Sequence, residues 1–222
     1  MCAFDTTWEE VYQKTGFGGG YPDTNLVRFV ARNLYSKDRK STRILEVGCG
    51  IGANLWYFAR EGFDTYGLDG SKTAIEKCSE RLKQQNYSCK LVVGDACATD
   101  LPHGYFDAVV DVECIYANRI SDIRRILSEI YRVLKTDGLF YSMMFGVKTT
   151  GYGLGKELEP NTFADIKSRA FAGRGIAHFF TEEEIRCLLE QAGFRDIEIN
   201  WVLRTEKQQQ ETIHEFLCQA KK

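Results

Sequence analysis

Apolar and polar residues follow two different periods along the middle of the chain. Short apolar runs, each ending at a glycine or an acidic residue, predict buried strands, and the segments between them repeat their apolar residues every three or four positions, which predicts helices. The predicted strands are 43–47, 64–69, 89–95, 105–113 and 139–145. The predicted helices between them are 53–62, 71–84 and 121–138. This alternation is typical of an α/β fold, in which helices cover both faces of a parallel sheet.

Two further helices are expected before the first strand. Thr7 stands three residues before Glu10, which is the spacing of a capping box. The segment 23–36 also has helical spacing, and the glycine-rich stretch 16–22 between the two helices indicates a hinge or loop. We therefore interpret residues 1–24 as a helix and hinge that can cover a site.

The last third of the chain departs from the alternation. Residues 147–177 form a long segment punctuated by glycines, and a loop of that length is more often a functional lid than a plain connection. A helix follows at 181–193, where Thr181 and Glu184 again have capping-box spacing. Two stretches of alternating apolar and polar residues then predict an antiparallel pair of strands at the edge of the sheet, 195–204 and 212–220.

Composition narrows the classes of function. The chain has 222 residues, 44% of them apolar, which is enough for a single domain with a large core. The formal net charge of −2 argues against a nucleic acid or an anionic membrane as the main partner. No apolar run has membrane-spanning length, and the start "MCAFDTTWEE" lacks the features of a signal peptide. The 8 cysteines occur singly, without a CxxC pair, which favours reduced thiols in a cytoplasmic protein and no metal site.

The stretch "ILEVGCGIGANL" carries the strongest chemical signal. Gly48, Gly50 and Gly52 let a ligand lie against the backbone between a strand and a helix. The spacing also fits a dinucleotide fingerprint, with Asp69 at the expected distance. Glu46, two residues before the first glycine, favours another ligand, because a carboxylate there repels a pyrophosphate and attracts an ammonium group and a sulfonium. S-adenosylmethionine offers both cations, a carboxylate for the backbone N–H groups of the loop and a ribose diol for Asp69.

Three motifs in this order resemble those of the class I S-adenosylmethionine-dependent methyltransferases: "LEVGCGIG", "GLDGS" and "VVGDA". The final pair of strands is similar to the reversed end of that family's sheet. The resemblance covers about residues 25–222 and implies one domain over 1–222. It implies a three-layer sandwich around a seven-stranded, mostly parallel sheet in the order 3-2-1-4-5-7-6, with strand 7 antiparallel and the cofactor at the carboxyl ends of the strands.

The resemblance also implies which residues meet the cofactor. Matched to the family motifs, they are Glu46, Gly48, Cys49 and Gly50 at the methionine end, Asp69 and Gly70 at the ribose, Asp95 and Ala96 at the adenine, and Asp111 and Val112 near the methyl group. Tyr12 and Tyr21, in the predicted N-terminal cover, are further candidates to lie beside the sulfonium.

A hydroxyl acceptor would benefit from a base, and histidine suits neutral pH. His178 stands where the predicted lid returns to the sheet and is the first candidate. Glu113 is the runner-up, and Tyr116 lies in the same stretch. His103 is expected in an exposed turn, and His214 is expected to pack on the last strand.

Four functions compete at this stage. We favour a methyltransferase that moves the sulfonium methyl to an O or N of a small molecule, as a monomer or homodimer and without a nucleic-acid or membrane partner. The stretch "DVECIYAN" lacks the proline-rich signature of enzymes that methylate nucleobase amines, which supports a small acceptor. The alternatives are transfer of another group from a cofactor derivative, a non-catalytic partner subunit and a nucleotide-binding oxidoreductase. Arg174 would suit an anionic substrate, although a solvated loop position is the simpler interpretation.

Overall fold

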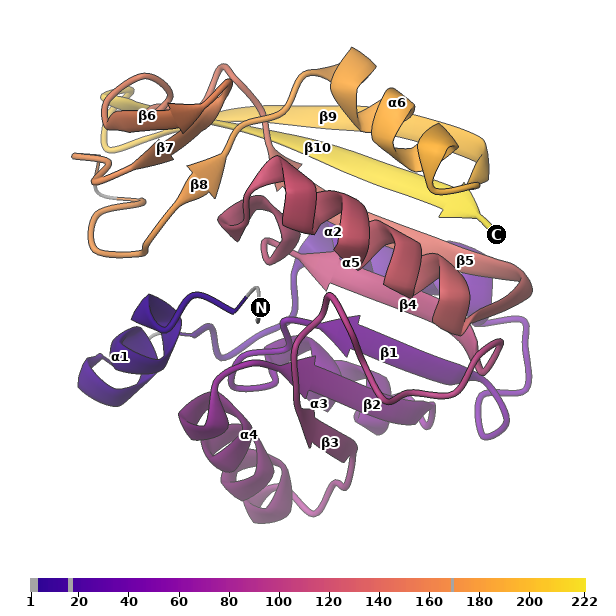
Figure 1. The fold of residues 1–222 in the computed structure, drawn as a ribbon. Coiled ribbons are helices and arrows are strands. Elements are labelled where there is room, and N and C mark those ends of the chain that lie inside the picture. Colours follow the sequence, from indigo (N-terminus) through magenta and orange to yellow (C-terminus); the bar gives the residue numbers. More distant parts are fainter. Residues whose placement is uncertain (1–3, 16–17, 169) are drawn as a thin grey trace.

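The computed structural model describes residues 4–15, 18–168 and 170–222. Its centre is a seven-stranded sheet in the order β3-β2-β1-β4-β5-β10-β9 (Figure 1). The strands are β1 Arg43–Val47, β2 Asp64–Asp69, β3 Lys90–Val93, β4 Phe106–Val112, β5 Leu134–Phe145, β9 Arg195–Glu206 and β10 Glu211–Lys221. Strands β1 to β5 are parallel, and β10 lies antiparallel between β5 and β9. The predicted order and the reversed last strand are therefore confirmed.

Helices cover both faces of this sheet. One face packs against α2 Thr24–Leu34, α3 Ala53–Arg60 and α4 Lys72–Gln84, and the other packs against α5 Ile120–Val133 and α6 Glu182–Gln191. Each helix buries one apolar stripe. That of α5 consists of Ile123, Ile126, Leu127, Ile130 and Val133. Full burial of such a side chain contributes about 1.5–3 kcal/mol, so these stripes hold the layers together.

Helix α5 ends earlier than the sequence predicts. The predicted helix 121–138 stops at Val133, and Leu134 is already extended and pairs with Phe106. A register shift between Phe106 and Ala108 lets β5 start there and continue through Gly138. Gly138 is therefore a strand residue and not the helix stop that its type suggested.

Of the two predicted capping boxes, the one at α1 does not form and the one at α6 forms only in part. At α1, Thr7–Lys14, Asp5 rather than Thr7 accepts the hydrogen bond, from the N–H of Thr7 at 2.9 Å. At α6, Thr181 Oγ1 accepts from the N–H of Glu184 at 3.2 Å, but the Glu184 carboxylate does not close the box. It lies 3.1 Å from His178 Nε2 instead.

The predicted lid segment, 147–177, contains secondary structure of its own. Strands β6 Lys156–Glu159, β7 Thr162–Ala164 and β8 Ala177–His178 form a small antiparallel sheet in the order β6-β7-β8. Phe163 on β7 and Phe171 both pack against the ring of Phe179, which directly follows β8. Figure 1 shows this sheet and α1 beside the end of the main sheet where β1 and β4 finish.

Candidate active site

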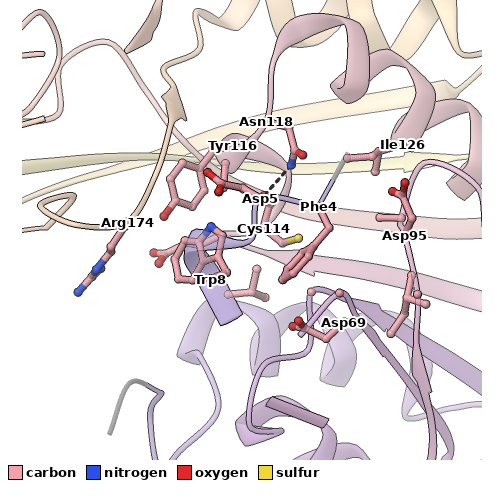
Figure 2. A pocket seen from close by; sticks show the side chains of 18 of the residues that line it. Phe4, Asp5, Trp8, Asp69, Asp95, Cys114, Tyr116, Asn118, Ile126 and Arg174 are labelled. Atoms are coloured by element: carbon pink, nitrogen blue, oxygen red, sulfur yellow. Dashed lines mark hydrogen bonds between the residues drawn. The ribbon is translucent and has the colours of Figure 1, made fainter. Parts of the chain in front are cut away.

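A cavity lies at the carboxyl ends of β1, β2, β3 and β4 and under the N-terminal segment (Figure 2). We call two parts of its wall the acid side and the aromatic side. The acid side consists of Asp69, Gly70, Gly94, Asp95 and Ala96. The aromatic side consists of Trp8, Glu113, Tyr116, Asn118 and Arg174. Phe4, Asp5, Tyr12, Gly48, Leu68, Val112, Cys114, Ala117 and Ile126 complete the wall.

The glycine loop allows the backbone to come close to its neighbours. Gly48, at φ 69°, faces Cys114 so closely that an added Cβ would lie 2.2 Å from the Cys114 sulfur. Gly50, at φ 51°, lies under the Tyr12 hydroxyl, 2.7 Å from where a Cβ would stand. Both positions therefore exclude a side chain through backbone conformation as well as space.

The N–H groups of the loop are largely taken up inside the protein. Those of Gly48 and Cys49 both donate to the Leu68 carbonyl, at 2.8 and 3.1 Å. The N–H of Gly50 donates to Asp69 Oδ2 at 2.8 Å. The expectation that these N–H groups hold the carboxylate of a ligand does not fit these hydrogen bonds. The glycines instead allow a ligand to come close to the backbone of the loop.

Asp69 ends β2 and lies at the base of the acid side. Its two oxygens accept from the N–H groups of Gly50 and Ser71, each at 2.8 Å. A carboxylate has about four lone-pair sites, so two remain for a ligand diol. Burial raises the pKa of Asp69, and the two backbone bonds oppose that rise.

Glu46 lies behind the glycine loop and outside the residues that line the cavity. It is 2% exposed, and its Oε1 accepts from Asn54 Nδ2 at 2.6 Å. Its Oε2 is buried and has no hydrogen-bond partner among the described residues. Burial raises the pKa of Glu46 well above the usual range. A buried carboxylate oxygen without a donor suits a cationic group, so this residue fits the ammonium of S-adenosylmethionine although the cavity wall does not include it.

Two other predicted acids differ in their position. Asp95 lines the cavity beside Ala96, and its Oδ1 accepts from the N–H of Cys97 at 2.9 Å. Asp111 is fully buried beneath the wall and anchors the turn after β4. Its Oδ1 accepts from the N–H groups of Cys114 and Ile115 at 2.9 and 3.0 Å, and its Oδ2 accepts from Ser142. Burial raises the pKa of Asp111 to about 6.

Figure 2 shows Trp8 and Tyr116 toward Arg174, on the opposite part of the wall from Asp95. The Nδ2 of Asn118 donates to the Cys114 carbonyl at 3.3 Å, which holds the turn that carries Glu113 and Tyr116. Burial raises the pKa of the Glu113 carboxyl to about 8, and the charge of Glu215 adds to this. The aromatic side thus joins rings, a carboxyl group and a guanidinium in one place.

The structure therefore gathers many predicted site residues and leaves others apart. Those that line the cavity are Tyr12, Gly48, Asp69, Gly70, Asp95, Ala96, Val112, Glu113 and Tyr116. Glu46, Cys49, Gly50 and Asp111 lie behind that wall, and Tyr21 is 82% exposed on the surface.

His178 lies outside the cavity wall. It is buried on β8, with Nδ1 2.7 Å from Thr162 Oγ1 and Nε2 3.1 Å from Glu184 Oε2. Both ring nitrogens are engaged in joining the small sheet to α6. The geometry corrects the expectation that this histidine faces an acceptor.

Two residues that precede α1, Phe4 and Asp5, also line the cavity, and the sequence patterns did not indicate this. Phe4 packs on Gly70, where an added Cβ would lie 2.1 Å from its ring, and Asp5 approaches Gly175 in the same way. Figure 2 shows Phe4 among Asp69, Asp95 and Cys114. Only Asp5 had a sequence signal, since aspartate is a favoured N-terminal capping residue.

The N-terminal segment is tied to α4 by Glu9, which accepts hydrogen bonds from the hydroxyls of Ser71 and Thr73. These bonds lower the pKa of Glu9 to about 2. The folded pKa is below the unfolded one, so this contribution is present above about pH 4.5 and is lost as the pH falls toward 2.

We expect Glu9→Gln to loosen α1, because glutamine replaces a charged acceptor with a neutral one. Hydrogen exchange at neutral pH should show faster exchange of the amides of Thr7–Lys14. Glu10→Gln is the matched control, since Glu10 pairs with Lys14 within α1 at an exposed site. Equal effects of the two changes would contradict a specific role for Glu9.

Residues 44–138 match the family model described as a methyltransferase domain. This range holds the glycine loop, Asp69, Asp95 and the turn after β4. The chain carries a methyltransferase domain. The match over residues 44–138 and the order of the sheet both resemble the class I S-adenosylmethionine-dependent methyltransferases, which argues against the dinucleotide interpretation of the loop.

Relatives of this methyltransferase domain act on different acceptors by name. It is 31% identical over 173 residues to malonyl-[acyl-carrier protein] O-methyltransferase of Geobacter sulfurreducens. The aligned region covers 75% of this chain and 60% of that protein. It is 27% identical over 165 residues to a tRNA N(3)-methylcytidine methyltransferase of Drosophila melanogaster, 69% of this chain and 49% of that one. The chain thus spans 60% and 49% of the length of these two relatives.

Solved structures show the same fold. An S-adenosylmethionine-dependent methyltransferase from Methanosarcina mazei superposes with a TM-score of 0.74 at 21% identity, covering 91% of this chain and 98% of that one. Phosphoethanolamine N-methyltransferase 2 of Haemonchus contortus, in complex with S-adenosyl-L-methionine, gives 0.68 at 18% identity, covering 97% and 56%. Among the described residues, no helix has the length and apolar character needed to cross a bilayer.

Proposed function

We propose that this protein transfers the methyl group of S-adenosylmethionine to an oxygen or nitrogen of a small molecule. One observation carries the proposal. A single cavity at the carboxyl ends of the strands joins an acid side suited to a nucleoside with an aromatic side that bears a carboxyl group. In parallel α/β sheets, ligands bind at this edge.

The cofactor's parts find complementary groups along the cavity. Asp69 and Asp95 offer carboxylate oxygens to the hydroxyls and amines of a nucleoside, and the small side chain of Ala96 leaves room for its flat ring. The unpartnered oxygen of Glu46 suits the ammonium group. When bound, the cofactor supplies an activated methyl group on a cationic sulfur, and the protein's contribution is mainly to position and shield it.

The N-terminal segment and the turn after β4 enclose the aromatic side. Trp8 and Tyr12 come from α1, and Tyr116 comes from the short helix η1, Ile115–Ala117. Their rings exclude water, which favours a transfer in which charge is dispersed. A cavity walled in this way suits a small acceptor, and Glu113 is the group placed to take its proton.

Two measurements test the proposal. Calorimetry should show saturable binding of S-adenosylhomocysteine and none of NAD. Radiolabelled S-adenosylmethionine should then label at least one acceptor in a panel of small amines, phenols and carboxylic acids, and should not label bulk tRNA. Labelling of tRNA alone would replace the proposed acceptor class, and absence of cofactor binding would overturn the function altogether.

A further inference from the structure

Two glutamates from distant parts of the chain meet beside the cavity. Glu113 follows β4 and lines the aromatic side, and its N–H donates to Met143 on β5. Glu215 on β10 pairs with Phe145, two residues further along the same strand β5, and its charge acts on the Glu113 carboxyl. Glu215 is 1% exposed and stands outside the residues that line the cavity. Glu113 therefore connects the cavity to a second, fully buried acid.

One carboxylate oxygen of this pair of glutamates has no hydrogen-bond donor among the described residues. Arg204 on β9 pairs with Oε2 of Glu215, whereas Oε1 of Glu215 is buried without a hydrogen-bond partner among the described residues. Asp23 adds a further negative charge near Glu113, and the Tyr116 hydroxyl is another titratable neighbour. Two carboxylates that lie close together in a buried site repel each other, so a proton held by the pair stabilises the arrangement.

The backbone holds Glu113 in an unfavourable conformation that fixes this geometry. Its φ is 56°, in the left-handed region that costs a residue with a side chain about 1–2 kcal/mol. The N–H of Glu113 donates to the Met143 carbonyl at 3.2 Å, and Asp111 fixes the next two N–H groups. Strain that is held in place by several bonds is concentrated at functional sites.

We propose that Glu113 is the proton acceptor for the methyl acceptor, and that Glu215 is a positioning residue that holds Glu113 in place and controls its proton. This inference rests on the proposed methyl transfer. In the step, the acceptor's N–H or O–H proton passes to Glu113 while the acceptor's electron pair forms the bond to the methyl carbon. The carbon–sulfur bond breaks, its electron pair stays on sulfur, and S-adenosylhomocysteine leaves. The proton then passes from Glu113 to water.

The first experiment needs no acceptor. The titration of Glu113 is followed by NMR of glutamate labelled with ¹³C at Cδ, and Glu113→Gln identifies its signal. We expect a pKa of about 8 in the wild type. Glu215→Gln should lower this pKa, because it removes a neighbouring negative charge, and Arg204→Gln should raise it, because it removes a positive one. Glu198→Gln, at an exposed position on β9, is the matched control and should leave it unchanged.

A pKa of Glu113 near the ordinary glutamate value in the wild type would overturn the inference, as would an unchanged value in Glu215→Gln. If Glu215→Gln fails to fold, Arg204→Gln still decides by the sign of its shift. Neither result depends on methyl transfer. If Glu113 titrates normally and the cofactor still binds, the role of the Glu113–Glu215 pair is contradicted and the proposed function is not. If the wild type does not bind the cofactor, the proposed function itself is contradicted.

The second experiment uses an acceptor from the panel described above. Only the ionised form of Glu113 accepts a proton, so kcat/KM should rise with pH and level off above about 8. In Glu215→Gln this rise should move to lower pH, which gives a gain of activity at pH 6.5. A merely structural role would lower activity equally at every pH and would contradict the inference.

Discussion

Replacing Asp69 with alanine is expected to weaken the binding of S-adenosylhomocysteine by about 3 kcal/mol, roughly 100-fold. The carboxylate is the group at the end of β2 that can accept hydrogen bonds from a ribose diol. The change also leaves the N–H groups of Gly50 and Ser71 without their acceptor, which loosens the glycine loop beside the cavity. Isothermal titration calorimetry measures the loss.

Asp100→Ala is the matched control for this change, because Asp100 is exposed and lies outside the cavity wall. Asp69→Asn provides a second comparison. It keeps one oxygen that accepts hydrogen bonds but loses the charge, so its affinity should fall between those of the wild type and the alanine variant. Unchanged affinity in Asp69→Ala would remove this residue from the nucleoside contacts.

The sheet and the acids at its edge were predictable because both are local in sequence. Strand ends are marked by the change from apolar residues to glycine or acid, and parallel strands bring their carboxyl ends to one edge. Asp69 and Asp95 therefore meet in the cavity as the sequence suggested. The order of the strands came from a resemblance to a known family and not from the spacing itself.

The pairing of Glu113 with Glu215 had no comparable signal. It depends on β10 lying beside β5, and on a left-handed backbone at Glu113 that apolar periodicity does not encode. His178 illustrates the opposite error. Its residue type suggested chemistry, but the segment before it folds into a small sheet that turns the ring toward Thr162 and Glu184. Side-chain direction in an irregular segment depends on tertiary contacts that residue type does not reveal.

Replacing Glu46 with glutamine is expected to weaken S-adenosylhomocysteine binding by about 2 kcal/mol, roughly 30-fold. The change keeps the size of the side chain and an oxygen for Asn54, but removes the carboxyl group that we propose ionises to pair with the ammonium group. The control ligand is 5′-methylthioadenosine, which has the nucleoside and no amino-acid part. Glu46→Gln should leave its affinity nearly unchanged, whereas Asp69→Ala should weaken both ligands. Equal losses for the two ligands in Glu46→Gln would contradict a contact with the ammonium group.

The same substitution should stabilise the protein when no ligand is bound. Burial raises the folded-state pKa of Glu46 above its unfolded value of 4.5, so ionisation of this carboxyl opposes folding. The free energy of unfolding therefore decreases as the pH rises from about 4.5 toward the folded-state pKa. Glutamine has no such proton to lose. The melting temperature of Glu46→Gln should therefore exceed that of the wild type at pH 7, and the difference should shrink below pH 4.5. A variant that is more stable but binds the cofactor more weakly indicates a residue kept for its ligand; a loss of both properties would instead assign Glu46 to the fold.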